Sequence, residues 1–414
     1  MSLSLPADRH RALPILLNQA IGLVAGLAGI RLASELVAPT DYGVYGLVVS
    51  LVPFGHGVVM AGLLKAVSRE WAATDDRGGL LRTVATRATK RLGWIALGAL
   101  LAAGAIAPRA AWWMAPALAV IATLHVIIQT TQLTRQAAGQ NWQDCGITAG
   151  IATLRSIVPP LLYLATGWGL PALVAGFSVH AVVVAAICLV VLHGDWRQAR
   201  PNAQPTLAEP YTGSLFAGLA IASLVVITFP RWLALHVFDA ETGGYFGLAA
   251  NVASIAPSML GTMALQYFQP GWFRREHPDA AARDALARAA DRVTALYTGA
   301  GLLATAALHA LMPVLIGPLI DARYAAAAGF IAPAGCAMTA ITAGYFYHAA
   351  LLASRRERAC ARVDLTGVAV LLAVALGGAL VSVEAFRWAL GLSPVIPWLV
   401  NRPLAHAALR RAEA

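Results

Sequence analysis

The stretch that decides the fold occurs twice. Residues 31–47 read RLASELVAPTDYGVYGL, and residues 231–248 read RWLALHVFDAETGGYFGL. Each copy begins with an arginine in an apolar run, passes through an acidic turn, and restarts with glycine, an aromatic residue and glycine. The matching positions are Gly43, Tyr45 and Gly46 in the first copy and Gly244, Phe246 and Gly247 in the second. Similar units about 200 residues apart indicate an internal duplication.

A second pair of matching sites supports the duplication. Arg135 and Asp144 are nine residues apart, as are Arg355 and Asp364. The repeat therefore predicts two halves, residues 1–200 and 201–414, with the same order of elements.

The composition places both halves in a membrane. Hydrophobic residues make up 59% of the 414 residues and charged residues 12%, and the mean hydropathy is +0.67. A soluble domain is about 45–50% apolar and about 25% charged. Too few polar groups remain to cover a water-soluble surface, which excludes soluble enzymes, nucleic-acid binders and disordered tails.

Apolar runs of about 20 residues predict an all-α polytopic membrane protein with about twelve transmembrane helices. In the first half we expect helices at about 12–34, 42–64, 92–108, 110–134, 146–166 and 170–192, with Gly167-Trp168-Gly169 as the turn between the last two. In the second half we expect helices at about 212–237, 244–270, 293–317, 324–352, 363–383 and 385–401. The basic segments Trp71–Arg91 and Arg274–Arg292 are typical of amphipathic helices lying along the membrane surface.

The basic residues predict the orientation. With both termini in the cytoplasm, 24 of the 30 Lys and Arg residues fall on the cytoplasmic side, as the positive-inside rule requires. Six helices per half is an even number, so the two lobes are parallel repeats. Parallel repeats predict a cavity between the lobes and alternating access.

Three arginines remain inside predicted helices. Arg155 is expected near mid-membrane, where an arginine costs about 2.5–3.5 kcal/mol on insertion scales, so it should face the protein interior or a wet cavity. There it could bind a phosphate or pyrophosphate, or be satisfied by carbonyls freed at Pro159-Pro160. Arg31 and Arg231 occupy equivalent repeat positions and could either contact an anion or pair with nearby acids. Buried polar residues such as His125 and Gln129 are either sugar contacts or helix-to-helix hydrogen bonds.

Several kinds of chemistry are not indicated. The two lysines, Lys65 and Lys90, do not follow glycine, so no ATP-binding P-loop is present. No hydrolase or metalloprotease motif occurs, and the four cysteines lack disulfide or metal spacing. We also expect no carboxylate at mid-membrane for proton coupling. The sequence predicts no enzyme, no catalytic residues, no metal site and no cofactor.

Residues 31–47, together with the twelve helices, the repeat and the basic segment after the second helix, resemble the lipid-linked oligosaccharide (O-antigen or polysaccharide) flippases. These belong to the multidrug/oligosaccharidyl-lipid/polysaccharide exporter (MOP) superfamily. The resemblance implies a multi-pass protein of the bacterial inner membrane that flips an undecaprenyl-pyrophosphate-linked glycan by alternating access. It implies substrate contacts at Arg155, Arg31, Arg231, Gln129 and His125.

The resemblance also limits the partners and leaves alternatives open. A lipid-linked glycan, membrane lipids, polysaccharide-assembly proteins and a coupling ion (proton or sodium) are the expected partners, and nucleic acid is not. The chain lacks two extra helices expected of peptidoglycan-precursor flippases. A multidrug or organic-cation antiporter of the same superfamily is the main alternative, and a membrane-embedded glycosyltransferase or polymerase comes after it.

Overall fold

The computed structural model describes residues 9–60, 63–64, 67, 71, 74–138, 140–197, 214–273, 280–354 and 356–410. These residues form thirteen α-helices with short 3-10 and π-helical segments, and the described residues contain no β-strand. The all-α prediction is confirmed. The ends of the predicted helices 42–64 and 212–237 reach residues outside the described ranges.

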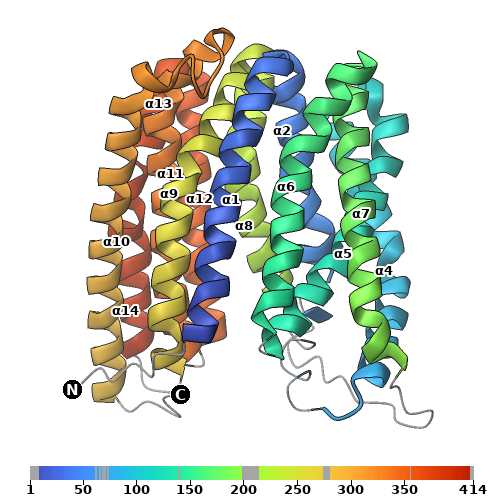
Figure 1. Ribbon diagram of the computed structural model, residues 1–414. Helices are drawn as coiled ribbons and strands as arrows, with labels where there is room; N and C mark the ends of the chain where they lie inside the picture. The colour runs from blue at the N-terminus through green and yellow to red at the C-terminus, as the bar shows by residue number, and fades with distance from the viewer. Residues whose placement is uncertain are drawn as a thin grey trace. The chain divides into compact units, whose positions relative to one another are not determined.

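Packing divides the chain into two units, which are described separately. The first unit comprises Met1–Leu36 and Val52–Gly213. Its main elements are α1 (Arg9–Leu36), the π-helix η1 (Gly55–Val59), α4 (Arg77–Ile106), η2 (Pro108–Ala110), α5 (Ala111–Ala137), α6 (Asn141–Thr166) and α7 (Leu170–Arg197). Helices α4, α5, α6 and α7 run side by side (Figure 1), and α1 packs along α6.

The second unit comprises Val37–Leu51 and Ser214–Ala414, so most of α2 (Pro39–Phe54) belongs to it. Its first elements are α8 (Ser214–Leu233), η3 (Ala234–Phe238), α9 (Ala240–Phe273), α10 (Ala280–Leu315), η4 (Ala322–Ala327) and α11 (Ala328–Ala353). Its last are α12 (Glu357–Val381), α13 (Val383–Gly391), η5 (Ser393–Val395), η6 (Pro397–Asn401) and α14 (Arg402–Arg410). Phe346 and Tyr347 of α11 are fully buried in a core cluster to which α9, α10, α12 and α14 also contribute.

Ten of the described helical segments are long and apolar enough to cross a membrane, and they coincide with ten of the twelve predicted helices. The predicted turn at Gly167-Trp168-Gly169 is also confirmed. Gly167 and Gly169 have φ of 65° and 66°, a left-handed conformation that glycine adopts without strain. The turn ends α6 and allows α7 to begin at Leu170.

The prediction of separate surface helices before the third and ninth spans is wrong for the described residues. Helix α4 starts at Arg77 and α10 at Ala280, and each continues without interruption into the apolar span. At 1.5 Å per residue, their 30 and 36 residues extend about 45 and 54 Å, against a hydrocarbon core of about 30 Å. The charged turns are therefore extensions of spanning helices.

The predicted last helix at 385–401 also needs correction. A short helix, α13, ends at Gly391, and a new helical run begins at Ser393 and continues through η5, η6 and α14 to Arg410. The break falls just before Pro394, which has no N–H to donate to the Leu390 carbonyl and is tolerated in the first turn of a new helix. The segment that follows α13 is therefore shifted toward the C-terminus and takes in the polar residues of α14.

The two repeat copies meet inside the second unit. Helix α2 begins with Pro39, a residue whose fixed φ suits the first helical turn. A Cβ atom on Gly43 would lie 2.7 Å from the backbone nitrogen of Gly244, and a Cβ on Gly244 would overlap the Pro39 carbonyl. Only glycine allows the first turns of α2 and α9 to approach so closely.

We expect Gly244→Ala to destabilise the second unit by about 1–3 kcal/mol, the usual cost of overpacking. Gly247→Ala, one turn along the same helix, is the matched control, because its Cβ would meet only the Tyr42 ring at 3.9 Å. Thermal unfolding of the purified variants measures the difference. Equal midpoints for the two variants would contradict the close crossing.

Candidate functional site

A cationic cluster lies in the middle of the first unit. Arg155 is near the centre of α6, within the candidate span Trp142–Thr166, and its side chain is exposed. Helix α6 packs against α5, which contains His125, and against α7, which contains His180.

His125 and His180 contact each other and Phe177 through their rings. His125 is half-buried and donates from Nδ1 to the Ile121 carbonyl at 2.9 Å. Its ring centroid is 5.9 Å from that of Phe177 and 6.0 Å from that of the buried His180. Gln129, one turn further along α5, is also half-buried. The structure thus groups His125 with Phe177 and His180, with Gln129 on the same helix as His125 and Arg155 on the neighbouring helix α6.

Arg31 lies at nearly the same depth as Arg155. A Cβ atom on Gly29 would be 2.6 Å from the Ser156 Cβ atom, so α1 and α6 touch at this level. Arg31 follows Gly29 by two residues and Arg155 precedes Ser156 by one. At 1.5 Å per residue, the two arginines are within about 5 Å of each other along the helix axes. Arg31 also forms the expected ion pair with Glu35, at 3.1 Å.

Arg231 belongs to a different environment, in the second unit. Its guanidinium donates to the Asn251 side-chain oxygen at 2.7 Å and to the Gly46 carbonyl at 3.4 Å. Asn251 in turn donates to the Tyr42 hydroxyl at 2.8 Å. Arg231 therefore connects α8, α9 and α2 through the residues of the repeat.

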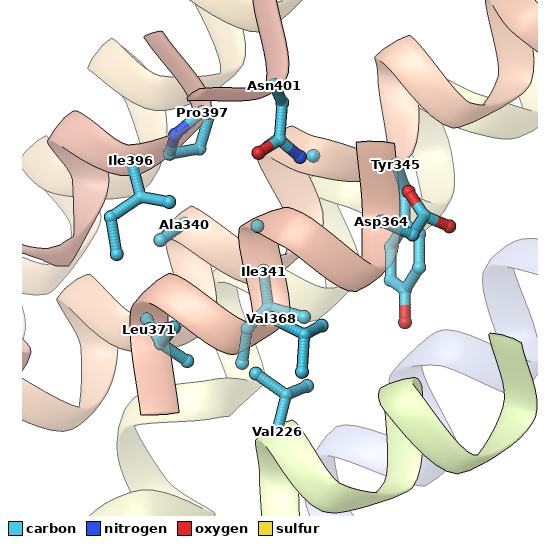
Figure 2. Close-up of a pocket in the computed structure, with 12 residues that line it drawn as sticks. Val226, Ala340, Ile341, Tyr345, Asp364, Val368, Leu371, Ile396, Pro397 and Asn401 are labelled. Atoms are coloured by element: carbon cyan, nitrogen blue, oxygen red, sulfur yellow. The ribbon is translucent and has the colours of Figure 1, made fainter. Parts of the chain in front are cut away.

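The second unit contains a small pocket with a carboxylate in its wall. Asp364 and Tyr345 lie together at one side, the Asn401 side chain points in from another, and Val226 and Leu371 contribute apolar surface (Figure 2). The Asn401 side chain is buried, and its oxygen has no hydrogen-bond partner among the described residues. The pocket therefore presents oxygen ligands to a small polar occupant.

Asp364 is also hydrogen-bonded to Nδ1 of His348. These two groups and the buried Cys360 thiol lie within 4.8 Å of one another, with Cys360 and Asp364 one turn apart on α12. Imidazole nitrogen, thiolate and carboxylate are ligands that could hold a metal ion. The hydrogen-bonded pair of His348 and Asp364 can equally share or exchange a proton.

Asp364 lies deeper in its helix than the sequence predicts, about 9 Å from the start of the candidate span Arg358–Val381 and short of its middle, so the expectation of no carboxylate at mid-membrane stays a prediction. Helix α12 starts at Glu357, about six residues before the predicted start, so Asp364 is two turns inside it and within the candidate span Arg358–Val381. The sequence carried one signal for this residue, the Arg355–Asp364 spacing. That spacing indicates a repeat and contains no information on the depth of the carboxylate.

The two sites suit opposite charges. The cationic cluster of the first unit, in which Arg155 carries the charge, can bind an anion through charge-assisted hydrogen bonds from the Arg155 guanidinium. The pocket of the second unit, with Asp364 and the Asn401 oxygen, can bind a cation or a proton. Both sites lie on helices that can cross a membrane.

No protein-family model matches the chain, and no curated protein matches it by sequence. Among solved structures, the chain is similar to an inward-facing multidrug resistance MATE family transporter of the MOP superfamily. The match has 10% identity, covers 97% of this chain and 100% of the other, and has a TM-score of 0.63.

Two further structures show the same likeness. The lipid II flippase MurJ, in an inward closed conformation, matches with 8% identity, coverage of 98% and 88%, and a TM-score of 0.64. A MOP superfamily transporter from Pyrococcus furiosus matches with 14% identity, coverage of 96% and 92%, and a TM-score of 0.56. The chain therefore has the fold of the MOP superfamily transporters.

Proposed function

We propose that the protein is a secondary transporter that flips a lipid-linked oligosaccharide, an undecaprenyl-pyrophosphate glycan or related polysaccharide precursor, across the bacterial inner membrane by alternating access. The observation that carries the proposal is the cationic cluster around Arg155. An arginine at the centre of a spanning helix is costly unless it has a function or a partner. A pyrophosphate that crosses the membrane requires such a charge at this depth.

We also propose roles for the other candidate substrate contacts. Arg31, at the depth of Arg155, is proposed as a second phosphate contact, and His125 and Gln129 as donors and acceptors for sugar hydroxyls. Arg231 is proposed to act from the second unit. The sequence halves 1–200 and 201–414 would serve as the two lobes, with both termini in the cytoplasm.

An organic-cation antiporter is the second candidate function, and the pocket at Asp364 favours it. A carboxylate beside apolar side chains such as Val226 and Leu371 suits a cationic, partly apolar molecule. Transport of a fluorescent organic cation by proteoliposomes, abolished in Asp364→Asn and retained in Arg155→Ala, would support this candidate over the flippase.

We expect Arg155→Ala to lower the flipping rate at least tenfold, because a hydrogen bond to a charged group contributes about 1.5–3 kcal/mol and each 1.4 kcal/mol is a factor of ten. Arg155→Lys should be intermediate, since it keeps the charge and loses the bidentate geometry. The measurement uses proteoliposomes with a fluorescent undecaprenyl-pyrophosphate oligosaccharide and a membrane-impermeant quencher.

Arg109→Ala is the control, because Arg109 is an exposed arginine at the end of a spanning segment. It should flip at the rate of the unmodified protein. Wild-type flipping by Arg155→Ala, at equal protein incorporation, would remove the basis of the proposal.

We further propose that the Asp364 pocket binds the coupling ion, a proton or sodium. Asp364→Asn should eliminate the acceleration of flipping by an imposed proton or sodium gradient while leaving the rate without a gradient within about twofold. Asp144→Asn is the matched control, because Asp144 is the repeat equivalent of Asp364 and bonds to Gln136 at 3.1 Å. A gradient response that survives in Asp364→Asn, or is lost equally in both variants, would contradict the assignment.

A further inference from the structure

A second cavity lies between the start of α12 and the C-terminal helix α14. Its lining combines basic and apolar residues. Three arginines surround it, and apolar side chains from both helices form the rest of its wall: Arg356, Arg358, Arg362, Val363, Leu404 and Ala407. A cavity of this composition matches a ligand with an anionic head and an apolar tail.

Polar contacts hold α14 in place as one wall of the cavity. Arg402 donates to Asp291 of α10 at 3.2 Å, and His406 lies 3.1 Å from the same carboxylate. Arg410 pairs with Asp284 at 3.3 Å. On the other side, Arg356 donates to the Ala408 carbonyl at 2.6 Å. The cavity is therefore bounded by a helix anchored to both α10 and α12.

The charges on the cavity wall differ from those that anchor α14. Arg402 and Arg410 have carboxylate partners, whereas Arg358 and Arg362 are exposed and form no ion pair with any carboxylate side chain that the structure describes. Arg358 and Arg362 are one turn apart on α12, so their guanidinium groups can converge on one anion. The cavity thus has a local excess of positive charge.

We expect the cavity to lie at the depth of lipid headgroups, because Arg358 is the first residue of the apolar segment Arg358–Val381, which is long enough to cross a membrane. Arginines at such a boundary attract anionic lipids. Val363 and Leu404 extend the apolar wall beyond the arginines, where an acyl chain would lie.

We propose that this cavity is a binding site for an anionic phospholipid. Arg358 and Arg362 bind the phosphate and the negatively charged head, and the acyl chain packs along Val363, Leu404 and Ala407. A bound lipid would join α12 to α14 and so add to the contacts through Asp291 and Asp284. The site is separate from the cationic cluster and from the Asp364 pocket, so the proposal does not depend on the transported substrate.

Native mass spectrometry of the purified full-length protein in detergent tests the proposal, with phosphatidylglycerol and phosphatidylcholine of identical acyl chains as probes. We expect phosphatidylglycerol to be retained at least tenfold more strongly than phosphatidylcholine. The double variant Arg358→Gln/Arg362→Gln should lose this preference. Arg288→Gln/Arg292→Gln is the matched control, because these exposed arginines of α10 have the same spacing and the same change in net charge.

A second variant separates a lipid from a free anion. Ala407→Phe fills the apolar part of the cavity without changing the charge, and it should reduce phosphatidylglycerol binding while the far-ultraviolet circular dichroism stays unchanged. Inorganic phosphate at millimolar concentration should not displace the lipid.

Three results would overturn the proposal. Equal losses in the two double-arginine variants would indicate diffuse attraction to the basic surface. Displacement by phosphate together with normal binding in Ala407→Phe would indicate a simple anion site. Equal retention of phosphatidylcholine and phosphatidylglycerol would show that the arginines do not select the head.

Discussion

The second unit depends on the contact between Gly43 and Gly244, where two helices approach until their backbones touch. These are equivalent positions of the internal repeat, so one duplicated turn packs against the other. The contact brings Tyr42 and Gly46 of α2 close to α8 and α9. There Arg231, Asn251 and Tyr42 form a continuous set of hydrogen bonds. A half-buried arginine is satisfied in this way by residues that the crossing itself supplies.

The two candidate sites differ in the charge of the groups that they contain. In the first unit Arg155 lies on a helix packed against those of His125 and His180, and in the second Asp364 is hydrogen-bonded to His348 beside a pocket that contains the Asn401 amide. Under the proposed function, one unit would bind the anionic substrate and the other the coupling cation, so neither site would need to serve both charges.

Much of the fold could be predicted from the sequence, because apolar runs and glycine-rich turns are local signals. The positions of α6, α7 and their turn followed directly from such signals. Three features of the fold could not be predicted from such local signals. Charged turns at the starts of α4 and α10 extend spanning helices, which hydropathy cannot distinguish from surface helices. The break before Pro394 shifted the last helical run. Asp364 lies inside α12 because the helix begins earlier than its apolar residues do. The clustering of His125 with Arg155 depends on packing between helices, which spacing alone does not determine.

The placement of α2 in the second unit has a consequence for the synthesis of the protein. Gly43 and Gly244 are about 200 residues apart, so at about 5–20 residues per second the ribosome makes Gly43 about 10–40 s before its partner. During that interval α2 has no α9 to pack against, and its own apolar residues must keep it in the bilayer. Helix α2 is thus the first element of this unit to be synthesised and among the last to reach its final contacts. Any division of the chain into two separately made fragments must keep residues 37–51 available to residues 214–414.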